Sequence, residues 1–208
     1  MADYTRPDVW ALQAQREGYP ARSIYKLKEI DEKFRLLKPS ALSRGLPQAN
    51  ILDMGAAPGS WSLYILRNTA LSLTAVDISP LSRQFDQGLF DDKKRFTFIQ
   101  ADMTSTETKT LIKERRPFFL VLSDAAPVTT GNRLIDTTRS LVLAETALEY
   151  AANVLAKGGR FAVKVFQSGD SNKLLRRLKA TFDKAVSFKP KSCRRESFET
   201  YYIGIGKK

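Results

Sequence analysis

Lys164 is the residue of this sequence whose surroundings point most directly to chemistry. It interrupts an apolar run over residues 161–166 that has the length and composition of a buried β-strand. Lysine is almost never buried without a partner, and Asp124 closely follows the preceding apolar run, residues 118–122. An ion pair between the two would add little stability against its desolvation cost, so we favour a functional interpretation over a structural one. Because the chain holds no histidine, this lysine is a candidate general base for a hydroxyl group.

A glycine-containing segment, Asp-Met-Gly-Ala-Ala-Pro-Gly-Ser-Trp over residues 53–61, is the second such feature. It follows an apolar start at Ile51 and precedes a helical pattern, which predicts the strand-to-helix turn where doubly wound sheets bind nucleotide-like cofactors. Gly55 and Gly59 would let the backbone turn tightly and approach a ligand. The spacing lacks the three glycines of the dinucleotide motif. It suits a cofactor with an adenosine and no pyrophosphate, S-adenosylmethionine above all, although an ordinary turn is the alternative.

Carboxylates follow the next predicted strands. Asp77 ends the apolar run 73–76, about 20 positions beyond the glycine turn, where an acidic residue can bond ribose hydroxyls. Asp102 follows the run 96–100. Because ligands bind outside the carboxyl ends of parallel strands, these carboxylates and Asp124 are expected to share one site.

The elements that must position these residues alternate between β and α from residue 51 onward, which predicts one α/β domain with a mostly parallel sheet. The last strand is expected over residues 200–206. Helices are expected over residues 8–18, 22–36, 134–156 and 171–182. Residues 157–159, with two glycines, are expected to end the third of these helices, and Ser171 to cap the fourth. Residues 39–50 are expected to form a loop.

Composition excludes several classes of protein. At 208 residues with 43% hydrophobic and 27% charged residues, the chain has the profile of an ordinary soluble domain. One cysteine and no histidine exclude a disulfide framework, a His- or Cys-rich metal site and any mechanism that needs a catalytic histidine. The charged first residues do not resemble a signal peptide, and no run approaches the length of a membrane span. We therefore expect a cytoplasmic protein.

The net charge of +12 favours a polyanionic partner. The excess is concentrated in two regions, and a solvated basic face is the alternative to a phosphate-binding surface. Between residues 173 and 195, Asp183 is the only acidic residue among Lys173, Arg176, Arg177, Lys179, Lys184, Lys189, Lys191, Arg194 and Arg195. The N-terminal region adds Arg6, Arg16, Arg22, Lys26 and Lys28. We expect the two regions to bind a nucleic-acid backbone.

Five motifs in order give the chain a resemblance to a known family. They are Arg-Ser-Ile-Tyr-Lys-Leu at 22–27, the glycine segment at 53–61, Leu-Ser-Asp-Ala-Ala-Pro at 122–127, Val-Lys at 163–164, and Ser-Phe-Glu-Thr-Tyr at 197–201. From about residue 15 to the end, the sequence resembles the FtsJ/RrmJ family of RNA 2′-O-ribose methyltransferases. The resemblance implies a single-domain Rossmann-like α/β fold with an antiparallel last strand, helices on both faces and an N-terminal helical extension, residues 1–38, that helps to bind RNA.

The resemblance also implies a site. A Lys-Asp-Lys-Glu tetrad surrounds the target hydroxyl in that family, and the matching residues are Lys26, Asp124, Lys164 and Glu199. The S-adenosylmethionine contacts carry over to Gly55, Gly59, Trp61, Asp77, Asp102 and Asp124. No metal is required. Cys193 is interpreted as incidental.

Two departures from the family pattern concern the neighbourhood of the ligands. Ser60 stands where the family usually has glycine, and its Cβ is expected near the cofactor. Residues 128–131, Val-Thr-Thr-Gly, replace the Asn-Met-Ser-Gly of bacterial members and are expected to border the substrate nucleotide.

The compact form of the chain most resembles the bacterial enzyme for a uridine of large-subunit ribosomal RNA. Transfer RNA or a messenger RNA cap is the alternative substrate, and a non-catalytic RNA-binding module is the alternative class. Ala125 and Ala126 after Asp124 disfavour a base N-methyltransferase, which typically has Pro-Pro-Tyr or Pro-Pro-Phe there. Cys193 lacks the setting of a cytosine-C5 nucleophile.

Overall fold

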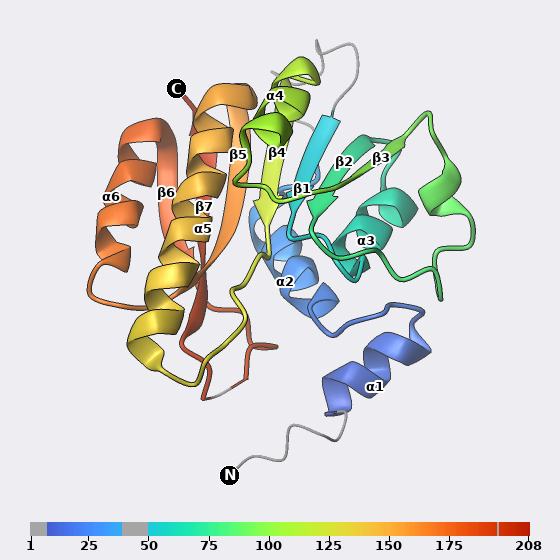
Figure 1. Cartoon of the computed structure of the whole chain (residues 1–208), viewed down its shortest axis with the longest axis horizontal. Coiled ribbons are helices and arrows are strands. Elements are labelled where there is room, and N and C mark those ends of the chain that lie inside the picture. The colour runs from blue at the N-terminus through green and yellow to red at the C-terminus, as the bar shows by residue number, and fades with distance from the viewer. Residues whose placement is uncertain (1–7, 39–49, 195) are drawn as a thin grey trace.

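A seven-stranded sheet forms the centre of the molecule (Figure 1). The computed structural model describes residues 8–38, 50–194 and 196–208. The strands are β1 (Asn50–Met54), β2 (Ser72–Asp77), β3 (Phe96–Gln100), β4 (Phe118–Ser123), β5 (Leu155–Phe166), β6 (Phe182–Phe188) and β7 (Glu199–Lys207). Their order is β3-β2-β1-β4-β5-β7-β6. Strand β7 is antiparallel to both of its neighbours, and β1 to β5 pair in parallel, so the predicted fold class is confirmed.

Helices cover both faces of this sheet. They are α1 (Val9–Arg16), α2 (Ile24–Phe34), α3 (Ser60–Asn68), α4 (Thr106–Glu114), α5 (Arg133–Val154) and α6 (Ser171–Thr181), with a short 3-10 helix at Leu89–Asp91. Helices α1, α2 and α3 contribute to the apolar core on one face, and α4, α5 and α6 to the core on the other. Figure 1 shows α5 in front of the sheet and α2 behind it. Ile24, Leu27 and Ile30 are buried, as their helical spacing predicts.

Strand β1 lies between β2 and β4 at the point where the strand order reverses. Open α/β sheets bind ligands at such a point, outside the carboxyl ends of the strands. Backbone hydrogen bonds draw those ends together here. Gly55 N donates to Val76 O at 2.9 Å, and Asp124 N donates to Met54 O at 3.2 Å. The glycine turn, Asp77 and Asp124 therefore follow three adjacent strands.

Strand β6 was missed by the sequence reasoning, which placed no element between the helix over 171–182 and the last strand. Only Phe182 of this edge strand is buried, and the strand carries exposed charged residues such as Asp183 and Lys184. It therefore lacks the continuous apolar run of an interior strand. Its pairing with β7 holds it in the sheet.

Two predicted helix ends were wrong. Helix α5 ends at Val154 because Leu155 adopts an extended conformation and pairs with Phe118 of β4. Gly158, with φ +77°, instead belongs to an irregularity near the start of β5. Ser171 is the first residue of α6 and not its cap, since its hydroxyl donates to the Ser168 carbonyl at 2.7 Å.

The loop expected over residues 39–50 lies outside the described residues except for Asn50, which begins β1. Arg6 and Arg195 of the basic regions also lie outside them. Among the helices of the described residues, none has the length and apolar character needed to cross a membrane.

Candidate active site

The four residues of the predicted tetrad meet at the carboxyl end of the sheet. Lys26 comes from α2, Asp124 follows β4, Lys164 lies in β5 and Glu199 begins β7. They form two ion pairs: Lys26 Nζ lies 2.5 Å from Glu199 Oε1, and Lys164 Nζ lies 3.1 Å from Asp124 Oδ1. Between 8% and 13% of each side chain is exposed, so four charged groups are held together with little access to water.

Tyr201 joins the two ion pairs. Its hydroxyl donates to Asp124 Oδ1 at 2.6 Å and lies 3.4 Å from Glu199 Oε1. Tyr201 pairs with Lys164 across β5 and β7, which fixes its position beside the lysine. The sequence assigned this tyrosine no role. Its place two residues after Glu199, on the same face of the strand, was the available signal.

Charge and burial act in opposite directions on these groups. Burial opposes ionisation of Asp124, but the positive charges of Lys164 and Lys26 outweigh it, so the pKa of Asp124 lies below its ordinary value. Burial likewise opposes the charge on Lys26, yet Asp124 and Glu199 raise its pKa. Burial and the same two carboxylates raise the pKa of Tyr201 well above its ordinary value. Tyr201 therefore stays protonated and acts as a hydrogen-bond donor.

The buried thiol of Cys193 is a further neighbour of the Glu199 carboxylate. Its sulfur lies 3.2 Å from Glu199 Oε1, and burial together with that carboxylate raises its pKa to about 12. It is therefore not an activated thiol, which agrees with the interpretation that it takes no part in chemistry.

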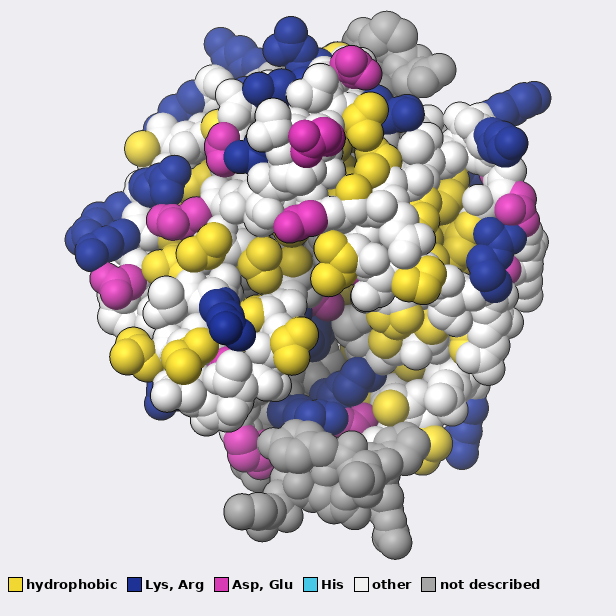
Figure 2. Space-filling model, viewed as in Figure 1, with side chains coloured by type: hydrophobic (Ala, Val, Ile, Leu, Met, Phe, Trp, Pro, Cys, Tyr) yellow, Lys and Arg dark blue, Asp and Glu magenta, His cyan; other side chains and the backbone are white. Residues whose placement is uncertain are grey.

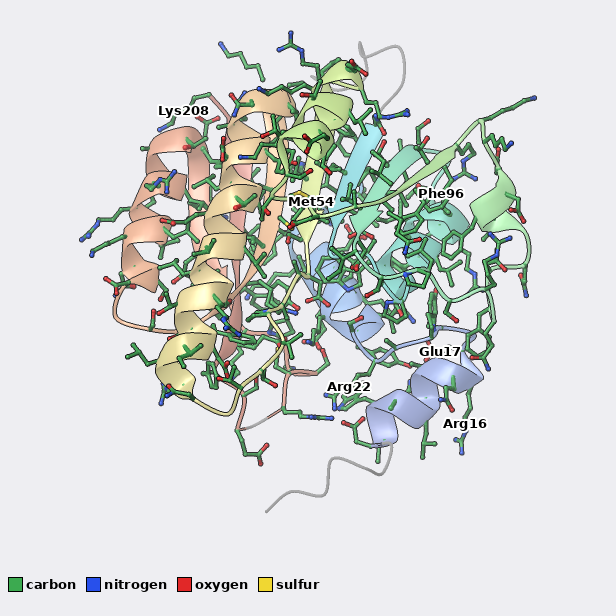
Figure 3. The ribbon with its side chains drawn as sticks, viewed as in Figure 1. Arg16, Glu17, Arg22, Met54, Phe96 and Lys208 are labelled. Carbon is green, nitrogen blue, oxygen red and sulfur yellow. The ribbon has the colours of Figure 1, made fainter. Side chains whose placement is uncertain are left out.

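A cleft of about 600 Å³ opens onto Lys26 and Glu199. Figure 2 shows a hollow below the centre of the view with Lys or Arg side chains inside it. Thr129, in the loop that departs from the family pattern, lines the cleft. The expected contact of this loop with the substrate nucleotide stays a prediction. Arg22 lies beside the beginning of α1 (Figure 3) and pairs with Asp8, the residue that caps that helix. The other lining residues are Phe166, Arg194, Glu196, Ser197 and Phe198.

The segment before the Lys26 helix is bonded to the beginning of α3. The Ser60 hydroxyl accepts from Ala21 N at 2.8 Å and donates to Ala21 O at 3.1 Å. Ser60 is buried, and its hydroxyl holds the segment that leads into α2. The expectation that its Cβ lies near the cofactor stays a prediction. The Trp61 indole N–H donates to Ser23 O at 2.9 Å, and its ring lies 6.0 Å from that of Tyr201. Its predicted cofactor contact stays a prediction.

The glycine turn is shaped first by contacts within the protein. Gly55, with φ +71°, lies against the backbone of Ala125, where an added Cβ would be 2.4 Å from Ala125 Cα. Gly59, with φ +110°, precedes α3, and an added Cβ would be 3.0 Å from the Phe90 ring. No other residue type combines this conformation with these close approaches.

Two further carboxylates belong to the ends of the next strands, Asp77 at the end of β2 and Asp102 after β3. Asp77 Oδ2 accepts from Ala57 N at 2.9 Å and its Oδ1 accepts from Ser79 N at 2.8 Å. Asp102 is exposed and accepts from Thr104. Because a carboxylate has about four acceptor positions, both can still bind ligand hydroxyl or amino groups.

Comparison with known proteins assigns the chain to a family. Residues 19–207 match the FtsJ-like methyltransferase family. The chain belongs to that family. The ribosomal RNA large subunit methyltransferase E of Treponema denticola is 46% identical over 204 residues, which cover 97% of this chain and 96% of that protein. The protein of the same description from Oleidesulfovibrio alaskensis is 42% identical, with 96% and 91% covered. The chain is thus a methyltransferase of the FtsJ-like family.

Solved structures agree with this assignment. A ribosomal RNA methyltransferase from Plasmodium falciparum is 26% identical, with a TM-score of 0.73 and coverage of 91% of this chain and 98% of that one. Human methyltransferase-like protein 13, solved in complex with SAH, is 16% identical with a TM-score of 0.59, covers 87% and 82%, and so shows the fold alone.

Asp53, the first residue of the glycine segment in this FtsJ-like methyltransferase, is fully buried beneath the site. Its Oδ2 accepts from the Ser62 hydroxyl at 2.8 Å, and its Oδ1 is without a hydrogen-bond partner among the described residues. Burial raises its pKa to about 7, and the charges of Asp124 and Asp77 add to the effect. Sequence reasoning gave this residue no function.

The C-terminal basic region is divided between two faces of the sheet. Helix α6, with Arg176 and Arg177, packs on the face that α5 covers. Residues near Cys193 pack on the face that α2 covers, where Glu29 accepts hydrogen bonds from the backbone of Lys191 and Ser192. The basic residues near Cys193 therefore lie beside the N-terminal basic region at the cleft, whereas α6 lies on the opposite face of the sheet.

Proposed function

We propose that this methyltransferase transfers a methyl group from S-adenosylmethionine to a ribose 2′-hydroxyl of RNA, and that its substrate is a uridine of large-subunit ribosomal RNA. The convergence of Lys26, Asp124, Lys164 and Glu199 in two ion pairs joined by Tyr201, with Lys26 and Glu199 lining the cleft, carries the proposal. The descriptions of relatives at 46% and 42% identity support the choice of ribosomal RNA.

The residues after β1, β2 and β3 fit S-adenosylmethionine. The carboxylates of Asp77 and Asp102 suit the hydroxyl and amino groups of an adenosine. Gly59 places no side chain at the beginning of α3, whose backbone N–H groups suit a carboxylate. Gly55, Trp61 and Asp124 complete the proposed binding residues. When bound, the cofactor supplies an electrophilic methyl group on a positively charged sulfur.

Lys164 is proposed to accept the proton of the hydroxyl. Its Nζ donates to both the carbonyl oxygen and the Oδ1 carboxylate oxygen of Asp124. To act as a base, Lys164 must first release to solvent one proton of the ammonium that pairs with Asp124. The neutral lysine then has two N–H bonds and one lone pair, so these two acceptors leave the lone pair for the substrate hydroxyl. Nζ would take the proton of the hydroxyl as the oxygen accepts the methyl group that bound S-adenosylmethionine would supply. Asp124 then stabilises the lysine ammonium that results.

Lys26 and Glu199 are proposed to orient the ribose. Lys26 has its charge fixed by Glu199 at 2.5 Å and borders the cleft, so it can donate to the reacting oxygen. Glu199 borders the cleft as well and can accept from a neighbouring ribose hydroxyl. Positioning of this kind supplies roughly 7–11 kcal/mol of barrier lowering at best.

The N-terminal helical extension, residues 1–38, is proposed to help bind the RNA. It carries Lys26 into the site, and Arg22 and Arg194 line the same cleft. Arg22 also donates to the Ser192 carbonyl, which joins the two basic regions at the entrance. Cations at the entrance of a cleft favour a phosphate backbone.

The test is incubation of the protein with radiolabelled S-adenosylmethionine and unmethylated large subunits, small subunits, free ribosomal RNA or transfer RNA, followed by nucleoside analysis. We expect label in 2′-O-methyluridine from large-subunit RNA. Label in transfer RNA or in a cap structure would support one of the alternative substrates instead. Label on a base, with the 2′-oxygens unlabelled, would overturn the proposed reaction.

A further inference from the structure

Phe198 is an aromatic residue at the wall of the cleft that holds Lys26 and Glu199. It directly precedes Glu199, and both line the cleft at the tetrad. In any nucleotide, the base is attached to the ribose carbon next to the one that bears the 2′-hydroxyl. A hydroxyl placed at Lys26, which lines the cleft, therefore has its base close to the other lining residues.

The ring of Phe198 is held in a fixed orientation. Its backbone carbonyl accepts from Gln167 N at 2.8 Å, which ties it to the end of β5. Phe166 meets the ring edge-on, with centroids 5.0 Å apart and an interplanar angle of 77°. Arg133 lies over the ring at 5.3 Å from its centroid. A ring fixed on two sides and half-buried is a preformed surface that loses little entropy on contact with a ligand.

Arg133 and Phe198 belong to different clefts. Arg133 and Gln167 line a second cleft of about 450 Å³, and Phe198 lines the cleft of the tetrad. The Phe198 ring thus contacts the arginine of one cleft and lines the other cleft together with Lys26 and Glu199. In the cleft of the tetrad, Arg22 and Lys26 supply positive charge, which suits the sugar–phosphate part of a nucleotide. Phe166 and Phe198 form an apolar wall of the same cleft, which suits a base.

We propose that Phe198, supported by Phe166 and Arg133, is the platform on which the base of the target nucleotide stacks. This inference rests on the proposed function, because it needs an RNA nucleotide in the tetrad cleft. Stacking requires the flat π-face of an aromatic ring and not only an apolar side chain.

The test compares Phe198→Leu, Phe198→Tyr and Phe198→Trp on unmethylated large subunits. Loss of one base stack is worth a factor of about 5 to 150, so Phe198→Leu should lower kcat/KM by such a factor, mainly through KM. The tyrosine and tryptophan variants should keep activity within about threefold, since both retain an aromatic face. Affinity for S-adenosylmethionine, measured by calorimetry, and the unfolding temperature should match those of the wild type.

Phe34→Leu is the matched control. Phe34 makes a similar edge-on contact with Phe188, at 5.4 Å and 80°, but lies outside the residues that line the tetrad cleft. It should leave kcat/KM unchanged. Wild-type kcat/KM in Phe198→Leu, or equal losses in all three Phe198 variants, would overturn the stacking role. A wild-type protein without ribose methylation of RNA overturns the proposed function, and the stacking role with it.

Discussion

Replacement of Lys164 by arginine separates the chemistry proposed for this residue from its contribution to folding. The Nζ–Oδ1 distance of 3.1 Å to Asp124 corresponds to a gross Coulomb attraction of about 5 kcal/mol at an effective dielectric constant of about 20. Removing one member of such a buried pair typically costs about 3–5 kcal/mol of stability. Lys164→Ala should approach the lower end of that range, because Lys26 and Tyr201 still stabilise the Asp124 carboxylate.

Lys164→Arg keeps a positive charge beside Asp124 and should lose less stability than the alanine variant. Guanidinium cannot give up its proton near neutral pH, so it cannot serve as a base. If Lys164 accepts the hydroxyl proton, both variants should lose about 10²–10⁴-fold in the rate of methyl transfer. Affinity for S-adenosylmethionine should remain close to that of the wild type in both.

Single-turnover rates at saturating cofactor, read beside thermal unfolding, decide the question. Lys207→Arg is the matched control, because Lys207 also lies in a strand and donates to a backbone carbonyl, that of Leu155 at 3.0 Å. It should turn over like the wild type. A near-wild-type rate for Lys164→Arg would refute the general-base assignment and leave Lys164 an orienting or electrostatic role.

Four further outcomes are expected. Tyr201→Phe removes a hydrogen bond to a charged group and should cost about 1.5–3 kcal/mol in unfolding experiments or in the activation barrier; unchanged stability and rate would contradict the bridging role. For Asp53, a pKa raised from 3.8 to about 7 means that the folded state holds a proton that the unfolded chain releases, so this group's contribution to stability falls as pH rises from about 4 to 7. In denaturation experiments, the free energy of unfolding of Asp53→Asn minus that of the wild type should therefore rise by up to about 4 kcal/mol from about pH 4 to about pH 7. A difference that does not change with pH would show that the pKa of Asp53 is not raised. Asp77→Ala should weaken S-adenosylmethionine binding by about 1.5–3 kcal/mol in calorimetry, and unchanged affinity would remove Asp77 from the site. Although α6 lies apart from the cleft, the positive charge of this region predicts that the RNA reaches it, so replacing Arg176 and Arg177 together should flatten the slope of log RNA affinity against log salt by about one to two units. An unchanged slope would place the RNA away from α6.

The parallel strands and the residues at their ends could be predicted from the sequence because both signals are local. Apolar runs mark the strands, and in a parallel sheet their ends share one edge, so Asp77 and Asp124 were predicted near the glycine turn before any contact was known. Lys26 and Glu199 were different. Nothing in their local sequence distinguishes them from solvated residues, and they were found through the resemblance to a family.

The interactions that hold the site were not predictable in this way. Ser60 bonds to Ala21 across 39 residues, and Tyr201 to Asp124 across 77. Periodicity and propensity carry no signal for a single hydrogen bond between distant segments. The sequence led us to expect the Ser60 Cβ near the cofactor, but it gave no sign that the Ser60 hydroxyl fixes the segment that leads into the Lys26 helix.

The arrangement of the tetrad around Tyr201 suggests why the two ion pairs have different tasks. The tyrosine hydroxyl lies closer to Asp124 than to Glu199, at 2.6 Å against 3.4 Å, and so donates chiefly to Asp124. With Lys164 as a second donor, Asp124 is held as a carboxylate. Glu199 has Lys26 and Cys193 as its main partners and borders the open cleft. Asp124 is thus suited to stabilising a charge that appears on Lys164 during the reaction, and Glu199 to contact with the ribose, although both are carboxylates with a lysine beside them.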